Sequence, residues 1–296
     1  MMRWLWLPIL LVLSGCSITV PFWSLPTASP PHAGDVVIPP EIVSEKQSVV
    51  RVSGPAPSCG KKIEGTGFVY APQRVVTAAH VVAGVVESLV VTADEGEGYQ
   101  ARVVAFDPDI DVAVLYVPDL SAPALHIAET LSEAPLGDAY LLGYRKDTEH
   151  AVVEPIRVDR RVEAESMDIY HKHQVTRTVL TLSADMRSGM IGAPLVLPGA
   201  TVSGMTFAAA VDHPDRGFAL AAKELLPITD AASDATRRVS TQQCDVDRPT
   251  SASSARTSVR GPGSVSRHEN AARRSASRRR SSATSLPIPA SGCRGL

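Results

Sequence analysis

The chain has 296 residues, which is enough for one large domain or for two domains of ordinary size. Its formal net charge is −2, and 44% of its residues are hydrophobic although only 5% are aromatic. No repeat of about 20 to 50 residues is visible, which argues against a solenoid. No apolar run reaches the about 20 residues of a comfortable membrane-spanning helix. The composition therefore indicates a globular protein.

The N-terminus has the pattern of a targeting segment. Residues 4–13 are apolar over the length of a signal-peptide core, and a Leu-Ser-Gly-Cys sequence follows that ends at Cys16. This ending resembles a bacterial lipobox, in which a peptidase cleaves before the cysteine and the cysteine is acylated. We predict a signal peptide over residues 1–16 and a membrane anchor at Cys16, which places the protein in the cell envelope or periplasm. A cleaved signal without lipid and an uncleaved anchor are the alternatives.

The next segment, residues 17–47, is rich in Pro and mixed with Ser, Thr and Gly, and it has no apolar period. Such a composition gives an extended and flexible chain. We therefore predict a tether that holds the folded part away from a membrane surface.

The central part of the chain has the pattern of a β-protein. Short β-branched runs alternate with turn signals, and the apolar residues are mostly Val, Ala and Leu. This pattern predicts an all-β sandwich or barrel rather than alternating strands and helices. The expected strand segments include residues 49–52, 88–92, 101–104 and 178–182.

Two segments of this part carry residues suited to acid–base chemistry. Residues 74–82 form a predicted strand that runs into Thr-Ala-Ala-His, with the histidine at position 80. Residues 109–115 read Asp-Ile-Asp-Val-Ala-Val-Leu, with Asp111 before an apolar strand. An imidazole exchanges protons near neutral pH, and a carboxylate can accept its other N–H. His80 and Asp111 are therefore a candidate catalytic pair.

A third segment, residues 187–196, reads Arg-Ser-Gly-Met-Ile-Gly-Ala-Pro-Leu-Val. Its glycines and proline resemble the frame of the nucleophile loop in the chymotrypsin-like serine proteases, and this resemblance puts Ile191 at the position of the attacking serine. A branched alkyl group has no proton to lose and no lone pair to attack a carbonyl. The segment therefore predicts a loop that has lost its nucleophile.

Together these segments resemble the chymotrypsin-like (trypsin-like) serine proteases, and most closely the MarP-type and HtrA-type extracytoplasmic bacterial proteases. The chain order of histidine, aspartate and nucleophile position is that of chymotrypsin rather than of subtilisin. The resemblance covers about residues 48–230 and implies two β-barrels. We place the first barrel at residues 48–120 and the second at residues 121–246.

The resemblance also implies the role of each site residue. His80 would act as general base and acid, Asp111 would orient its imidazole, and Ile191 is the degenerate nucleophile position. The backbone N–H groups of Gly189 and Ile191 would form the oxyanion hole. Because Met190 stands where the family has Asp or Asn, we expect this loop to be poorly anchored.

Further segments contain candidate residues for binding or catalysis. The strand segment Gly217, Phe218 and Ala219 resembles the family's late strand that lines the substrate groove. Ser188 is an alternative nucleophile, but it would need a register shift that moves the flanking Gly and Pro out of place. Two further serines are expected to be strand residues rather than nucleophiles; they are Ser183 and Ser203.

Metal and cofactor chemistry are not expected. His171 and His173 put two imidazoles on one face of an extended segment, but no Cys or carboxylate companion has ligand spacing. We interpret this segment as an exposed polar loop and predict no metal and no cofactor.

The cysteines fit an oxidising compartment. In the resembling proteases a disulfide ties the start of the first barrel to the end of the second, and Cys59 and Cys244 occupy the corresponding places. An unpaired state of both thiols is the alternative. Cys293 is left without an assigned partner.

The C-terminal residues 247–296 are predicted to be disordered. From residue 251 onwards they contain nine arginines against one acid, Glu269, with almost no large apolar residues. Arginine runs can bind nucleic acid or anionic lipid. An exported protein rarely meets nucleic acid, so we expect a solvated extension and no nucleic-acid partner.

Three functions remain open on this sequence. The favoured one is an exported pseudoprotease that keeps a peptide-binding groove for a peptide or protein ligand. The alternative is an active serine endopeptidase of MarP or HtrA type with a different nucleophile. A decaying copy without function is the third. Loss of the triad serine lowers turnover by about 10⁶, which favours the first.

Overall fold

The computed structural model describes residues 37–242, except 87–88, 94–95, 130–135, 187, 212 and 214. The predicted lipidation site at Cys16, the predicted tether up to residue 36, Cys244 and the tail at 247–296 therefore lie outside the described residues.

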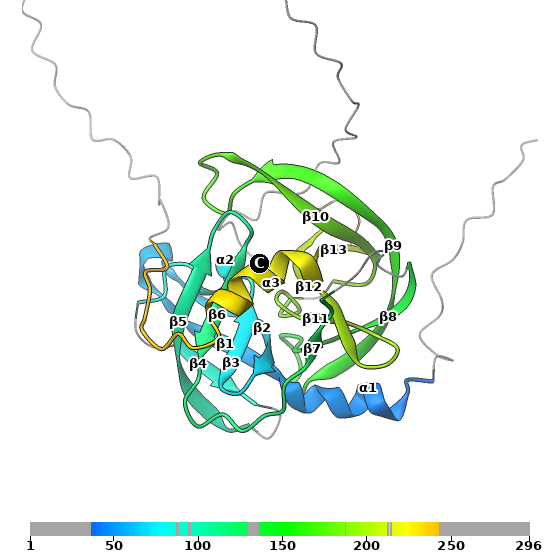
Figure 1. Cartoon of the computed structure of the whole chain (residues 1–296), viewed down its shortest axis with the longest axis horizontal. Helices are drawn as coiled ribbons and strands as arrows, with labels where there is room; N and C mark the ends of the chain where they lie inside the picture. Colours follow the sequence, from blue (N-terminus) through cyan, green and yellow to red (C-terminus); the bar gives the residue numbers. More distant parts are fainter. Residues whose placement is uncertain are drawn as a thin grey trace, which may run out of the picture. The chain divides into compact units, whose positions relative to one another are not determined.

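The first barrel is a closed ring of six antiparallel strands in the order β1-β2-β3-β6-β5-β4 (Figure 1). Its strands alternate buried and exposed side chains where one face meets solvent, as the burial of β1 shows. The central β3 is buried along its whole length. The strands are β1 (Val49–Ala56), β2 (Lys61–Ala71), β3 (Arg74–Thr77), β4 (Leu89–Thr92), β5 (Gly98–Asp107) and β6 (Val112–Tyr116).

The second sheet has seven strands in the order β11-β8-β9-β10-β13-β12-β7. Strand β11 also pairs with β12, so the six antiparallel strands close on themselves while β7 adds parallel to β12. The strands are β7 (His126–Ile127), β8 (Gly137–Gly143), β9 (Val152–Met167), β10 (Gln174–Ser183), β11 (Pro194–Leu197), β12 (Thr201–Ala209) and β13 (Arg216–Ala221). The prediction of an all-β, two-barrel chymotrypsin-like fold is confirmed.

A short helix corrects the C-terminal end of the predicted tether. Residues expected to be extended form α1 (Pro40–Ser44) and a 3₁₀ turn, η1 (Glu45–Ser48). Proline suits the first position of a helix because its missing N–H has no partner there anyway. Ile42 is buried in the main core, so apolar burial, invisible in the Pro-rich composition, fixes this turn.

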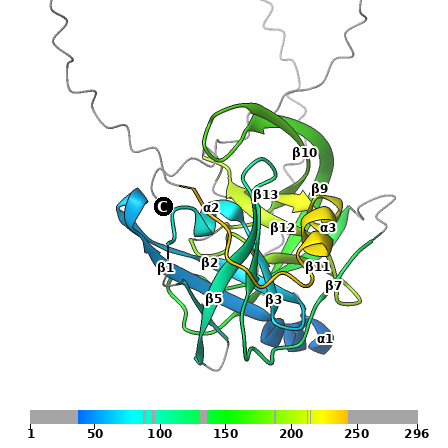
Figure 2. The same ribbon diagram turned by 60° about the vertical axis from the view of Figure 1, so that its left-hand side comes forward.

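The β9–β10 hairpin curves over the first barrel (Figure 2). Its connecting residues return to the turn before β6, where the Ile169 N–H donates to the Pro108 carbonyl at 3.2 Å. The Tyr170 hydroxyl donates to the Thr241 carbonyl at 2.6 Å. The hairpin is thus tied to the turn before β6 in the first barrel and to the C-terminal segment of the described chain.

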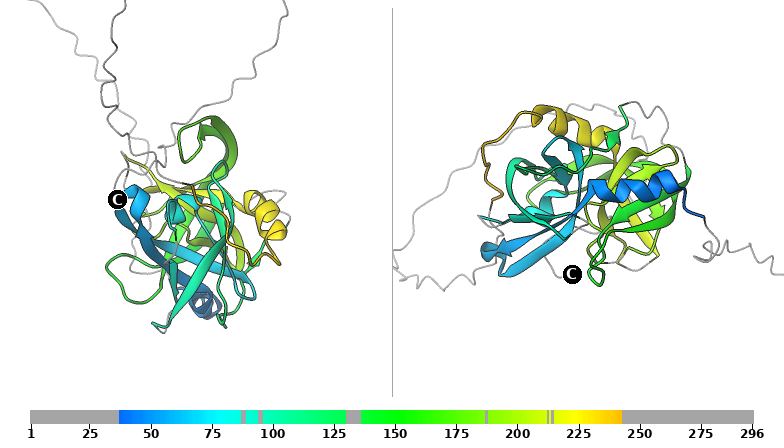
Figure 3. Two further views of the ribbon diagram at one scale, coloured as in Figure 1. Left: turned by 90° about the vertical axis from the view of Figure 1, so that its left-hand side faces the viewer. Right: turned by 90° about the horizontal axis from the view of Figure 1, so that it is seen from below.

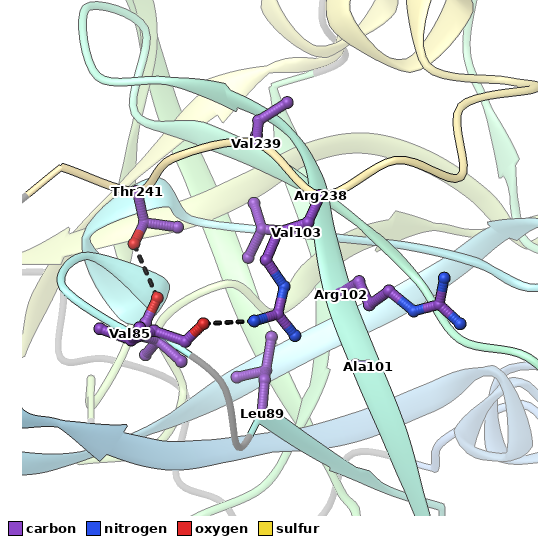
Figure 4. Close-up of a pocket in the computed structure, with 9 residues that line it drawn as sticks. Val85, Leu89, Ala101, Arg102, Val103, Arg238, Val239 and Thr241 are labelled. Atoms are coloured by element: carbon purple, nitrogen blue, oxygen red, sulfur yellow. Dashed lines mark hydrogen bonds between the residues drawn. The ribbon is translucent and has the colours of Figure 1, made fainter.

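The C-terminal part of the described chain also spans both barrels. Helix α3 (Ala222–Ala231) packs against β12 and is followed by a segment that returns to the first barrel (Figure 3). There the Val239 N–H donates to the Val103 carbonyl at 2.9 Å. Figure 4 shows the small hollow under this segment, where Arg238 donates to the Val86 carbonyl. No helix in residues 37–242, as far as they are described, is long and apolar enough to cross a membrane.

Candidate active site

His80 is placed by the change from strand to helix after β3. The strand ends at Thr77, and His80 is the second residue of the four-residue helix α2 (Ala79–Val82). The Ala79 N–H donates to the backbone carbonyl of Asp111 at 3.2 Å. This backbone contact brings the start of α2 against the turn that carries Asp111.

The structure brings the His80 and Asp111 side chains together. The His80 Nδ1 lies 2.8 Å from Asp111 Oδ2 and 3.0 Å from Oδ1, and the His80 backbone N–H donates to Oδ1 at 2.9 Å. Asp111 is fully buried, while the His80 side chain is 22% exposed. With Nδ1 on the carboxylate, the tautomer leaves Nε2 for a ligand or proton transfer.

The turn before β6 holds Asp111 in an unusual backbone conformation. Its φ is +68°, in the left-handed region that Asp tolerates better than most residues. Asp107 stabilises this turn, since its Oδ1 accepts the N–H groups of Asp109 at 2.9 Å and Ile110 at 3.0 Å. Of the three aspartates in this segment, Asp111 alone pairs with His80, and Asp107 shapes the turn.

A buried arginine that sequence reasoning missed lies behind this turn. Arg177 on β10 is 1% exposed, and its Nε donates to the Asp109 carbonyl at 2.7 Å. Its Nη2 donates to the Met167 carbonyl at 3.3 Å. Burial lowers the pKa of Arg177, and nearby carboxylates, Asp111 first, raise it. The only sequence signal was a charged residue directly before the strand predicted at 178–182.

The nucleophile loop is held by hydroxyl groups from both barrels. Thr66 on β2 donates its Oγ1 to the Gly189 carbonyl at 2.7 Å, and its N–H donates to the Ile191 carbonyl at 2.8 Å. Thr206 on β12 donates its Oγ1 to the Met190 carbonyl at 2.6 Å. These contacts correct the expectation that the loop is poorly anchored, because none of them needs a polar side chain at position 190.

Met190 and Ile191 both face inward. Met190 is 2% exposed and belongs to an apolar cluster with Leu141 and Leu195, while Ile191 is 9% exposed and belongs to the main core. No side chain of the loop's described residues thus offers a hydroxyl at the position beside His80. Ser188 is exposed, and its carbonyl accepts the Lys146 N–H at 2.8 Å.

Two of the loop's glycines are required by close approach of other backbone. A Cβ on Gly189 would lie 2.4 Å from the Tyr144 carbonyl oxygen, and a Cβ on Gly192 would lie 2.0 Å from that of Thr66. Both have positive φ, +100° and +87°. The Gly frame that the sequence shows is therefore a packing requirement of the loop.

The predicted groove strand is enclosed. Gly217, Phe218 and Ala219 lie on β13, which pairs with β10 on one side and β12 on the other. Their backbone is therefore engaged within the sheet. The end of β12 differs, because Ala208 and Ala209 pair with β13 alone among the described residues, after a register shift that passes over Phe207. Sequence periodicity could not show which of two adjacent strands has a free edge.

The structure supplies carboxylate companions for His173. The His173 Nε2 lies 2.8 Å from Asp109 Oδ1, and Asp168 places a carboxylate oxygen 3.8 Å from Nδ1. Ligand atoms of these three residues lie within 4.8 Å of one another. Asp168 also accepts the Lys172 N–H at 2.6 Å. These contacts explain why the three side chains lie close together: they hold the β9–β10 hairpin against the turn before β6.

The remaining predicted residues are placed in the second barrel and near α2. Ser183 and Ser203 are strand residues on β10 and β12, as the sequence predicts. Cys59 is disulfide-bonded, and its Sγ lies 3.6 Å from the Ala83 carbonyl oxygen. Its predicted partner, Cys244, is outside the described residues.

Two β-barrels with a His–Asp pair and a Gly-framed loop between them define the class of trypsin-like serine proteases. The sequence profile of the trypsin-like peptidase domain matches residues 65–205. Serine protease Rv3671c of Mycobacterium tuberculosis is 38% identical over 221 residues, which are 74% of this chain and 54% of that protein.

Solved structures support the same assignment. The crystal structure of the Rv3671c protease from M. tuberculosis in its active form is 39% identical, with a TM-score of 0.65 over 69% of this chain and 88% of that one. The HtrA-type protease AlgW with tripeptide shares the fold, at 19% identity and a TM-score of 0.55 over 65% of this chain and 62% of that one. The chain therefore belongs to the trypsin-like peptidase family. It spans about half the length of the curated Rv3671c relative, 54%.

Proposed function

We propose that this chain is a catalytically impaired member of the trypsin-like peptidase family that binds peptides without cleaving them. The observation that carries the proposal is Ile191, which occupies the nucleophile position in an otherwise formed site. The His80 Nδ1 lies 2.8 Å from Asp111 Oδ2, yet the side chain at position 191 has no hydroxyl group that His80 could deprotonate.

The chemistry of acyl transfer explains why this single position matters. The imidazole of His80 can take a proton only from a group that then attacks the substrate carbonyl. Ile191 has neither a proton to give nor a lone pair. Removal of the serine from such a triad lowers turnover by about 10⁶. We therefore expect peptide hydrolysis at background level.

Binding does not depend on the missing hydroxyl. The edge of β12 at Ala208 and Ala209, which pairs with β13 on one side only, would offer backbone donors and acceptors to an extended peptide beside the nucleophile loop. The originally predicted groove residues Gly217, Phe218 and Ala219 lie one strand further away, and we propose that they support this edge from behind.

The alternative is an active serine endopeptidase that uses Ser188. Its favourable observation is that Ser188 is exposed and adjoins the loop. The position of Ser188 in the loop argues against this alternative. The Lys146 N–H binds the Ser188 carbonyl, whereas Thr66 holds the following residues Gly189 and Ile191, so Ser188 does not take the place of residue 191.

Export and covalent stabilisation belong to the same proposal. We propose a lipid anchor at Cys16, which would hold the protein at the membrane of the cell envelope, and a disulfide between Cys59 and Cys244. The described end of the chain supports the pairing, since Gly84 donates to the Thr241 carbonyl at 3.4 Å next to Ala83, which lies by Cys59. Fractionation of wild type and Cys16→Ala tests the anchor; a wild-type protein found soluble in the cytoplasm contradicts it.

The catalytic proposal is tested with an activity-based phosphonate probe and a peptide library. The wild-type protein should remain unlabelled and should cleave nothing above background. Ile191→Ser should gain labelling, because His80, Asp111 and the loop backbone are in place. The matched control is His80→Ala in the Ile191→Ser background, which should lose that gain.

Two results would overturn the proposal. One is peptidase activity of the wild type that disappears with His80→Ala, in which case Ser188→Ala should be tested as the next nucleophile. The other is an Ile191→Ser protein that folds, stays inactive and binds no peptide, which favours a decayed copy.

A further inference from the structure

We propose that the nucleophile loop is a preformed carboxylate site that receives the C-terminal carboxylate of a bound peptide. The site consists of the backbone N–H groups of Gly189 and Ile191 next to the His80 imidazole. This inference rests on the proposed loss of catalysis and names the kind of peptide end that the groove takes.

The direction of the two N–H groups follows from their peptide planes. In a trans peptide the C=O and N–H point in opposite directions, and the described residues contain no cis peptide bond. The Ser188 carbonyl points to the Lys146 N–H, and the Met190 carbonyl points to the Thr206 hydroxyl. The N–H groups of Gly189 and Ile191 therefore point away from these anchors.

Neither N–H group has a protein acceptor among the described residues. Their neighbours differ, because the Gly192 N–H donates to the Thr206 carbonyl at 2.8 Å and the Ala193 N–H donates to the Met190 carbonyl at 3.2 Å. The N–H groups of Gly192 and Ala193 are thus engaged within the molecule, whereas those of the three residues from Gly189 to Ile191 have no acceptor among the described residues. This is the arrangement of a loop shaped to bind an oxygen from outside.

Thr66 makes the site rigid on the first-barrel side. Besides its two contacts to the loop, its Oγ1 accepts the Tyr144 N–H at 3.0 Å, and its carbonyl accepts the Thr77 hydroxyl at 2.6 Å. Thr66 is fully buried. A side chain with all of its polar groups engaged holds one conformation, so the loop donors are fixed before any ligand arrives.

The His80 segment and the loop adjoin the same point of β2. A Cβ on Gly65 would lie 2.8 Å from the Val81 side chain and 3.1 Å from the Ile191 carbonyl oxygen. Val81 follows His80 directly in α2. The helix that carries His80 and the loop that carries Ile191 therefore meet at the same point of β2.

The absence of a nucleophile decides which ligand satisfies these donors. In an active protease they are complementary to the negative oxygen that forms when the serine attacks. Ile191 forms no such adduct, so an internal peptide carbonyl stays neutral. A C-terminal carboxylate brings its own negative charge, and hydrogen bonds to a charged acceptor are about twice as strong as neutral ones.

The test is an NMR titration of the full-length protein labelled with ¹⁵N at glycine and isoleucine. Three probes are compared: a random tripeptide library with free C-terminal carboxylates, the same library with C-terminal amides, and acetate. We expect the Gly189 and Ile191 amide signals to shift with the acid library and with acetate. The amide library should bind roughly tenfold more weakly.

Variants separate the loop from general stability. Thr66→Val should weaken binding of the acid library by roughly fivefold, because hydrogen bonds that anchor the loop are lost. Thr66→Ser keeps the hydroxyl and should bind the acid library as the wild type does. The matched control is Ser203→Ala, which removes a buried hydroxyl on β12 that bonds to the Leu195 carbonyl rather than to the loop. Its titration should be unchanged.

The outcomes distinguish this proposal from the proposed function. Equal binding of both libraries overturns the carboxylate site and leaves the peptide groove standing. Shifts with acetate but with neither library support the carboxylate site and overturn peptide binding. No shift with any probe overturns both.

Discussion

The two halves of the candidate site differ in what they have kept. The first-barrel half retains its reactive side chains, with His80 and Asp111 paired and Asp111 fully buried. The second-barrel half carries an alkyl side chain at Ile191, where we propose that the nucleophile is missing, and its loop backbone is held by Thr66 and Thr206. Side-chain chemistry and backbone shape are thus encoded by different residues, and one can be lost without the other.

The largest expected effect tests how far the loop backbone tolerates a side chain at a position where other backbone lies close. Gly192→Ala should destabilise the protein by about 4 kcal/mol or more, since its Cβ would lie 2.0 Å from the Thr66 carbonyl oxygen. Thermal denaturation measures the loss. Gly199→Ala is the control, because it has a similar φ of +93° but no heavy atom within 4 Å of the added Cβ, and it should cost about 1 kcal/mol.

A second prediction tests whether the loop needs a polar residue at position 190. Met190→Asp should destabilise the fold by about 3 kcal/mol, since it buries a carboxylate among apolar side chains. Denaturant unfolding gives the difference. Met190→Leu keeps the volume and should cost less than about 1.5 kcal/mol. An unchanged stability of Met190→Asp would mean that the loop had moved to solvate the new group.

The third prediction concerns the link between the first barrel and the chain end. If Cys59 and Cys244 are bridged, reductant should lower the free energy of unfolding by about 2 to 4 kcal/mol. Cys59→Ala should reproduce this loss and should not respond to reductant. Free thiols at both positions in protein recovered from an oxidising compartment would disprove the bridge.

The smallest effect is a pH dependence away from the site. Burial raises the pKa of Tyr70 to about 12, and its hydroxyl donates to the Thr229 carbonyl at 3.1 Å. The folded state therefore holds this proton more tightly than the unfolded chain, whose tyrosines titrate near pH 10. The stabilisation is fully present below about pH 10 and is lost as the pH rises towards 12.

Thermal unfolding measured from about pH 9 to about pH 12, a range that includes both pKa values of Tyr70, tests this prediction. Tyr70→Phe should flatten the alkaline part of the profile, because phenylalanine does not titrate. An identical alkaline decline in both proteins would assign it to other groups. The His80–Asp111 pairing should be insensitive to this substitution, since Tyr70 contacts α3 rather than the site.

The sequence by itself determined the fold class and pointed to His80 and Asp111, whose side chains the structure brings together; the interpretation of Ile191 as a missing nucleophile also comes from the sequence and stays a prediction. These features depend on short contiguous segments: β-branched runs between turns, and motifs that can be recognised without knowledge of how the barrels pack. The family membership followed from the same motifs and is confirmed.

The tertiary structure alone decided how the site is held. Thr66, Thr206 and Arg177 act across the contact between strands that are distant in the chain, and sheet register determines which of their atoms meet. Met190 was expected to weaken the loop, but its burial shows that position 190 is part of the core. Sequence motifs record which groups could react, whereas only closure of both barrels shows which buried hydroxyls and backbone groups fix those groups in place.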